Sequence, residues 1–187
     1  SYITSYGKLI QMVPDLYTAW HAGKSNWQND KSLNHKSIGI EISNPGHKHG
    51  YRKFNDKQIK TLINISKTLI KKYKINKKNI LGHSDIAPSR KVDPGEKFPW
   101  KLLSKNKIGM WHDINYKKKF LMKKIAKFDL QKFSKYLTKI GYRINYSKPF
   151  QLKKLTKIFQ MRFRPEIVDG KLDLECFMIA KSLKNIR

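Results

Sequence analysis

The residues best suited to chemistry lie in one short run, GHSDIAPSRKVDPG, at positions 82–95. The imidazole of His83 and the carboxylate of Asp93 are groups that zinc accepts as ligands, and Lys91 comes two residues before Asp93. So many polar side chains and prolines in one loop favour a role in a reaction. A polar surface turn with a chance histidine is the alternative that this run, by itself, leaves open.

A second candidate group is Glu41, in the run SIGIEI at 37–42. The period of two in a strand places the three isoleucines on one face and Glu41 on the other, beside Gly39, whose missing side chain leaves room for another group. A carboxylate in the middle of a sheet covered on both faces is costly unless it is paired, so Glu41 is a candidate general base with a raised pKa. The alternative is a partly exposed strand end.

A third run, AWHAGKSNW at 19–27, sets small residues between two indoles and an imidazole. This composition suits a loop that lines a cleft for a sugar or a peptide. The alternative is that Trp20 and Trp27 cap the hydrophobic core. Three further histidines are interpreted as surface residues: His35, His47 and His49.

Strands and a short helix are expected to hold these groups. Residues 8–13 have the pattern of the second arm of a hairpin. Residues 79–81 are predicted to form a strand that delivers His83 to its carboxyl end, where open α/β sheets bind their ligands. A short helix is expected to follow Trp100.

Helical spacing dominates the rest of the chain. Asn55 and Gln58 form a capping box in front of an amphipathic helix that runs to about Lys74. In the last third, apolar residues at helical spacing predict three short helices near 130–140, 152–159 and 173–183. The run of three lysines at 117–119 marks the expected domain boundary. We therefore predict an α/β domain at 1–113, in which helices flank a mixed sheet, and a small three-helix domain at 114–187.

Charge is the outstanding feature of the composition. The net charge is +28, and the 41 basic residues comprise 35 lysines and 6 arginines spread along the chain. Proteins that read nucleic acids rely on arginine for bidentate base contacts, so nucleic acid is not expected as a partner. Two explanations of the positive charge remain open. One is a solvated, lysine-rich surface, and the other is attraction to a polyanion, either nucleic acid or an anionic cell wall.

The remaining composition excludes several classes. Cys176 is the single cysteine, which excludes an internal disulfide and a cysteine-based zinc cluster. No apolar stretch is long enough to span a bilayer. The protein is expected to be a monomer. The chain begins at Ser1 rather than at methionine, so a natural amino terminus with any targeting signal is expected further upstream.

The three runs occur in the same order in the zinc-dependent N-acetylmuramoyl-L-alanine amidases, and the chain resembles the AmiD type of this family. The run FQMRFRP at 159–165, with Asp169 and Gly170, resembles the signature of the peptidoglycan-binding-like helical domain that this type carries at its C-terminus. The resemblance covers nearly the whole chain.

The resemblance implies a Zn²⁺ ion bound by His83 and Asp93 and by one further histidine, with water in the fourth position. Glu41 corresponds to the general acid/base of the family, and Lys91 to the cation beside the developing oxyanion. Four residues correspond to the substrate cleft: Trp20, His21, Ala22 and Asn34. The implied reaction is hydrolysis of the amide between N-acetylmuramic acid and L-alanine in peptidoglycan or in muropeptides.

The chain departs from the family pattern at its start. The first zinc histidine of the family lies on a strand upstream of the hairpin, and this chain begins after that point, so that strand of the fold is expected to be missing. The alternative function is a catalytically inactive peptidoglycan binder without the first zinc ligand. The resemblance implies a periplasmic or cell-envelope location if the upstream segment carries a signal, and a cytoplasmic one otherwise.

Overall fold

The computed structural model describes residues 1–114, 127–143 and 149–186. A small sheet in the order β2-β1-β5 joins an antiparallel to a parallel pair of strands, which confirms the mixed sheet. A two-stranded ribbon pairs β3 with β4. The strands are β1 (Tyr2–Ile3), β2 (Leu9–Ile10), β3 (Asn26–Trp27), β4 (Asp30–Lys31) and β5 (Glu41–Ile42).

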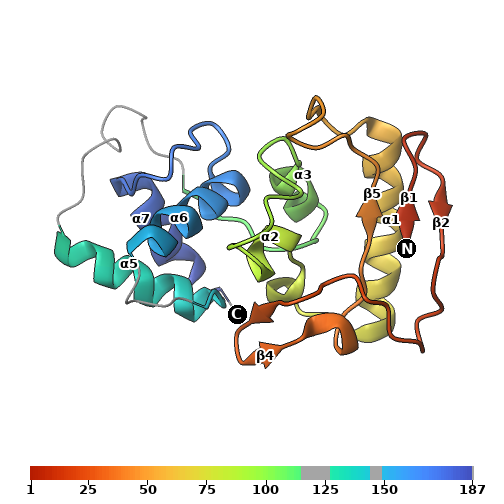
Figure 1. Ribbon diagram of the computed structural model, residues 1–187, viewed down its shortest axis with the longest axis horizontal. Helices are drawn as coiled ribbons and strands as arrows, with labels where there is room; N and C mark the ends of the chain where they lie inside the picture. The colour runs from red at the N-terminus through yellow and green to blue at the C-terminus, as the bar shows by residue number, and fades with distance from the viewer. Residues whose placement is uncertain (115–126, 144–148, 187) are drawn as a thin grey trace.

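Helix α1 (Asp56–Tyr73) packs along the sheet (Figure 1). The predicted capping box is confirmed, because the Asn55 side chain accepts from the Gln58 backbone N–H while the Gln58 side chain accepts from the N–H of Asn55. Its apolar stripe joins β1 and α3 (Trp100–Lys105) in one core, which contains Ile3, Ile59, Leu62, Phe98, Trp100, Leu103 and Ile108.

The predicted strand at 79–81 is wrong. The Asn76 side chain accepts a hydrogen bond from the Lys78 backbone N–H and turns the chain into the 3-10 helix η2 (Lys77–Asn79). The next carbonyl, that of Ile80, accepts from the Arg162 side chain at 2.8 Å instead of from a neighbouring strand. His83 therefore begins the short helix α2 (His83–Ile86) rather than following a strand.

The predicted strand at 37–42 is correct only over its last two residues. β5 pairs with β1, which supplies only Tyr2–Ile3 to the ladder, and the Ser1 carbonyl accepts from the Glu41 N–H at 2.9 Å. Ile38 lies outside the ladder and is 37% exposed, whereas Ile40 packs against the α1 core. The alternation of faces therefore holds over a shorter strand than expected.

The three predicted C-terminal helices are confirmed as α5 (Lys127–Ile140), α6 (Pro149–Phe163) and α7 (Leu174–Leu183). Figure 1 shows them together on the left, with α2 and α3 between them and the sheet. The lysine run at 117–119, on which the domain boundary was predicted, lies outside the described residues. Within those residues, no helix combines the length and the apolarity that crossing a bilayer requires.

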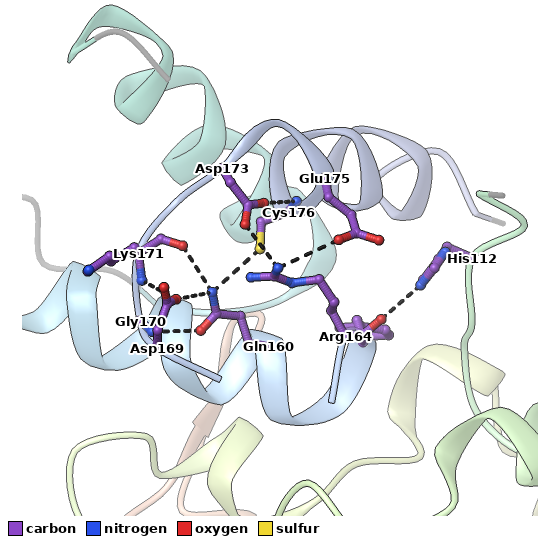
Figure 2. Close-up of polar contacts among 10 residues, drawn as sticks. His112, Gln160, Arg164, Asp169, Gly170, Lys171, Asp173, Glu175 and Cys176 are labelled. Atoms are coloured by element: carbon purple, nitrogen blue, oxygen red, sulfur yellow. Dashed lines mark hydrogen bonds and ion pairs between the residues drawn. The ribbon is translucent and has the colours of Figure 1, made fainter. Parts of the chain in front are cut away.

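Buried polar side chains of α6 organise this helical part (Figure 2). The Gln160 amide donates to the Asp169 carboxylate at 3.0 Å and its carbonyl accepts from the Gly170 N–H at 2.7 Å. Arg164, the residue that directly follows α6, pairs with Asp173 at 2.9 Å and with Glu175 at 3.6 Å. These contacts fix the turn between α6 and α7.

One hydrophobic core spans the two parts of the chain. Trp27 is 4% exposed and packs edge-on against Tyr142, with ring centroids 5.1 Å apart. Gly141 leaves room for the indole, because a Cβ at this position would lie 2.5 Å from it. The Gln28 N–H also donates to the Gly141 carbonyl at 2.8 Å. The segments on either side of the predicted boundary therefore pack as one unit here.

A buried ion pair crosses the same junction. The Asp85 carboxylate of α2 is 2% exposed and pairs with the Arg162 guanidinium of α6, which also donates to the Ile80 carbonyl. The other carboxylate oxygen accepts from the Tyr142 hydroxyl at 2.6 Å, and the Gly82 N–H donates to Asp85 at 2.8 Å. The helix that begins with His83 is thus held by side chains from the C-terminal part.

We expect Arg162→Leu to lower the free energy of unfolding by about 3–5 kcal/mol, because it leaves the Asp85 carboxylate buried without its partner. Urea denaturation of the whole chain measures the change. Arg52→Leu, which removes an exposed arginine, serves as the control and should stay within about 0.5 kcal/mol of the parent. A loss below about 1 kcal/mol for Arg162→Leu would show that Asp85 does not depend on this charge.

Candidate active site

His83 and Asp93 form the centre of the site. The Nδ1 atom of His83 lies 3.2 Å from Oδ2 of Asp93, and the two side chains are 19% and 52% exposed. The Ser84 N–H donates to the Asp93 carbonyl at 2.8 Å, which ties the loop to α2. Gly82 leaves room for Pro94, which follows Asp93, since a Cβ at position 82 would lie 2.6 Å from the Pro94 side chain. The structure therefore brings together the two residues predicted as metal ligands.

The geometry of this pair suits two ligands of one zinc ion. Zinc bonds of 2.0–2.1 Å at a tetrahedral angle separate neighbouring ligand atoms by about 3.3 Å. The observed 3.2 Å between the imidazole nitrogen and the carboxylate oxygen matches this separation. Within the described ranges, no three His, Cys, Asp or Glu side chains gather as a metal site. His83 and Asp93 thus fit as part of a ligand set.

Glu41 and Lys91 are two further charged groups that interact electrostatically with this pair. Partial desolvation and the negative charge of Asp93 raise the pKa of Glu41, against the lowering influence of His83 and Lys91. At Asp93, partial burial is the largest influence and opposes ionisation, but the hydrogen bond and charge of His83 hold its pKa below the usual value. The pKa of Glu41 is raised, as expected, but the residue is exposed and begins a short strand, which is the alternative that the sequence left open.

His21 fills the space that Gly39 leaves open beside Glu41. A Cβ at Gly39 would lie 2.5 Å from the imidazole of His21. The ring is held by the Ala19 carbonyl at 2.9 Å from Nδ1 and by the Ser37 hydroxyl at 3.1 Å from Nε2. Desolvation is the main cause that lowers its pKa, and the positive charges of His83 and the amino terminus add to it. His21 therefore borders the site in surroundings that favour its neutral form.

Asn34 holds the loop that carries His21 and Ala22. It is 8% exposed, and its side-chain oxygen accepts from the N–H groups of Ala22 at 2.8 Å and Gly23 at 3.2 Å. Ala22 is 1% exposed, and its carbonyl lies 3.2 Å from Nε2 of His83. Both residues, predicted as substrate contacts, make these polar contacts within the protein and position the loop against His83.

Arg90 also holds this loop, and sequence reasoning gave it no role. Its guanidinium donates to the carbonyls of Ala22 and Lys24 and lies 3.3 Å from Nε2 of His83. A Cβ at Gly23 would lie 2.9 Å from the Arg90 guanidinium, so the glycine makes this approach possible. The sequence did offer a signal for a role of Arg90, because arginine is scarce and one of the six arginines lies inside the run at 82–95.

The two tryptophans of the third run have different environments. Trp20 is 79% exposed and contacts the His35 ring edge-on, with centroids 5.5 Å apart. Trp27 is buried in the core that the two parts of the chain share. The alternative that tryptophans cap the core is thus correct for Trp27 only, and Trp20 offers an exposed indole next to His21 in the chain.

A second loop braces the segment that follows Asp93. The Tyr51 hydroxyl donates to the Pro94 carbonyl at 2.6 Å and accepts from the Lys97 N–H at 2.9 Å. Burial raises the pKa of Tyr51 to about 12, so it remains a neutral donor. His47, predicted to lie on the surface, is exposed and pairs with Glu96 at 3.0 Å. This support for the metal-ligand loop was also missed.

Comparison with known proteins identifies relatives of the whole chain. A family model described as N-acetylmuramoyl-L-alanine amidase matches residues 1–96. The chain is 35% identical over 184 residues to the N-acetylmuramoyl-L-alanine amidase AmiD of Escherichia coli, which covers 94% of this chain and 67% of AmiD. It is 43% identical over 94 residues to the 1,6-anhydro-N-acetylmuramyl-L-alanine amidase AmpD of Enterobacter cloacae, which covers 50% of this chain and 48% of AmpD.

Solved structures show the same fold. Escherichia coli AmiD, in complex with the substrate anhydro-N-acetylmuramic acid-L-Ala-D-γ-Glu-L-Lys, superimposes with a TM-score of 0.85 at 34% identity, covering 94% of this chain and 72% of that one. AmpDH3 of Pseudomonas aeruginosa gives a TM-score of 0.81 at 35% identity, covering 93% of this chain and 71% of that one. The chain thus spans about two thirds of its longer relatives and half of AmpD.

We expect Asn34→Ala to destabilise the protein by about 1–3 kcal/mol, because it leaves two loop N–H groups without their acceptor. Thermal or urea unfolding measures this loss. Asn29→Ala, at an exposed asparagine of the neighbouring turn, is the control. If Asn34→Ala keeps parental stability and only raises the Michaelis constant, Asn34 contacts the substrate and the positioning role is wrong.

Proposed function

The chain belongs to the N-acetylmuramoyl-L-alanine amidase family, and we propose that its site hydrolyses the amide bond between N-acetylmuramic acid and the L-alanine of the stem peptide. The observation that carries this proposal is the meeting of four groups at one place. Glu41 and Lys91 act electrostatically on the close pair of His83 and Asp93. Together they include a proton acceptor, a cation and two metal-binding side chains.

A zinc ion is the proposed cofactor. His83 and Asp93 would hold it through the imidazole and carboxylate that now lie 3.2 Å apart. Bound there, zinc would act as a Lewis acid toward the scissile carbonyl. A catalytic zinc usually has three protein ligands, so a third donor must join these two.

The proposed chemistry is addition of water followed by cleavage of the C–N bond. Glu41 takes a proton from the attacking water, as its raised pKa favours, and passes it to the leaving nitrogen of L-alanine. The Lys91 ammonium stabilises the oxyanion that develops on the carbonyl oxygen. The products are the carboxylate of the muramic acid lactyl group and a stem peptide with a free amino group.

The substrate would lie over the loop at 19–27. Trp20 presents an exposed indole, which suits the apolar face of a sugar ring. His21 borders the same region beside Glu41, with both ring nitrogens engaged by protein oxygens. Soluble muropeptides and intact peptidoglycan both contain the scissile bond, and we propose the cell envelope as the place of action because the polymer is found there.

We expect Glu41→Gln to lower the hydrolysis rate by about 10²–10⁴-fold, because the amide cannot carry the proton. Release of stem peptide from an anhydromuramyl tripeptide, followed by chromatography, measures it. The control is Glu96→Gln, which removes a neighbouring carboxylate paired with His47 and should keep most of the activity. Activity of Glu41→Gln close to the parental rate would exclude Glu41 as the general base.

The metal prediction has a readout that is independent of turnover. The protein is dialysed first against zinc and then against zinc-free buffer, and elemental analysis should then find about one zinc per chain. A chelator should remove both the metal and the activity. His83→Ala should retain much less zinc than the control His35→Ala, whose imidazole contacts Thr18. Hydrolysis by metal-free protein would overturn the zinc proposal. Binding of peptidoglycan with neither zinc nor hydrolysis would favour the alternative, a non-catalytic binder.

A further inference from the structure

The outer face of α1 carries a regular row of lysines. Their spacing of three, four or seven residues places them along one side of the helix, opposite the apolar stripe that packs on the sheet. All are exposed, and the 18-residue helix extends this row over about 27 Å. We call this row the lysine stripe: Lys57, Lys60, Lys67 and Lys71 of α1, together with Lys74, the residue that directly follows the helix.

The lysine stripe is not neutralised by the protein. Residues 52–81 contain ten basic residues and a single acidic one, Asp56. In the part of the chain that the structure describes, no carboxylate pairs with a stripe lysine, whereas the adjacent Lys72 pairs with Asp15 at 2.9 Å. Lys67 donates to the Asn106 side chain at 3.3 Å, which brings the exposed Lys105 and Lys107 beside the stripe.

Such a row favours an extended anionic partner. Lysines three and four residues apart on a helix repel one another, and a line of anions relieves that repulsion. The stripe consists of lysines, which lack the planar guanidinium that arginine uses for bidentate base contacts, and the exposed Tyr73 is the aromatic residue beside it in the chain. Arginine-based readout of bases is therefore not expected of the stripe, and charge complementarity is its main means of recognising a partner.

The substrate of this family offers anions of the required kind. A stem of the sequence L-Ala-D-γ-Glu-L-Lys carries a free α-carboxylate on the γ-linked glutamate and another on the terminal lysine, against one side-chain ammonium. Each such stem therefore has a net charge of −1, and a glycan that bears many of them is a polyanion. A soluble muropeptide presents only one stem, whereas the polymer presents many along its length.

We propose that the lysine stripe docks the enzyme on polymeric peptidoglycan through the stem carboxylates, an inference that rests on the proposed function. α1 lies along the sheet, and α2, which carries His83, lies toward the C-terminal helices (Figure 1). The stripe faces away from the sheet, so docking leaves the site open. Holding the enzyme on the polymer raises the local concentration of scissile bonds without changing the chemistry at Glu41.

The test is a variant with all five stripe lysines replaced by glutamine. Its matched control replaces five exposed lysines of the C-terminal helices by glutamine, with the same change in net charge: Lys135, Lys139, Lys153, Lys157 and Lys181. Co-sedimentation with insoluble peptidoglycan measures binding, and release of stem peptide from a soluble anhydromuramyl tripeptide measures the chemistry. Both assays are run with zinc present.

We expect the stripe variant to bind the polymer at least about tenfold more weakly than the control, since it loses five cation contacts. Its hydrolysis of the soluble tripeptide should match that of the parent. Raising the ionic strength from about 0.15 M to about 1 M, which shortens the screening length from about 8 Å to about 3 Å, should weaken binding of the parent more than binding of the variant.

Equal binding by the stripe variant and the control would overturn the proposal, because net charge alone would then explain adsorption. The proposal would also be overturned if the stripe variant bound peptidoglycan as well as the parent does but no longer bound duplex DNA in a separate binding assay. That result would assign the stripe to nucleic acid. Absence of tripeptide hydrolysis in the parent would instead contradict the proposed function, and the sedimentation result would still report on docking.

Discussion

The buried carboxylate of Asp85 is the constraint on which the site depends. It lies at the start of α2, two residues after His83, and nearly all of it is removed from water. An ion in that position is tolerated only if charges and hydrogen bonds surround it, and Arg162 and Tyr142 supply them from the C-terminal part. The C-terminal helices are therefore part of the support of the site, because their side chains hold the helix that carries His83.

The same logic explains the buried polar residues of α6. Gln160, and Arg164 directly after the end of the helix, face the helical part, where they fix the turn before α7. Arg162 lies on the other side of the helix and faces α2. One short run of sequence thus serves two interfaces, and the run that resembles a peptidoglycan-binding signature owes its polar residues to internal support.

Small residues determine how closely the loops around the site approach one another. Gly39 admits the His21 ring, Gly23 admits Arg90, and Gly82 admits Pro94. Each approach replaces water by protein near the reacting groups, and this desolvation raises the pKa of Glu41 and lowers that of His21. The local electrostatics of the site therefore follow from packing, even though the chain as a whole is strongly basic.

The sequence by itself determined the helices, their capping, and the candidate groups His83, Asp93 and Glu41, because helical periodicity and the order of short motifs are local properties. It overstated the strands at 37–42 and 79–81, since a strand needs a partner for its backbone, and here Arg162 took the Ile80 carbonyl. Only the tertiary structure decided that Asn34 and Ala22 support a loop, that Arg90 clamps it, and that Asp85 binds Arg162 77 positions away. These contacts join residues far apart in the chain, and no local pattern encodes which distant side chain will fill a given space.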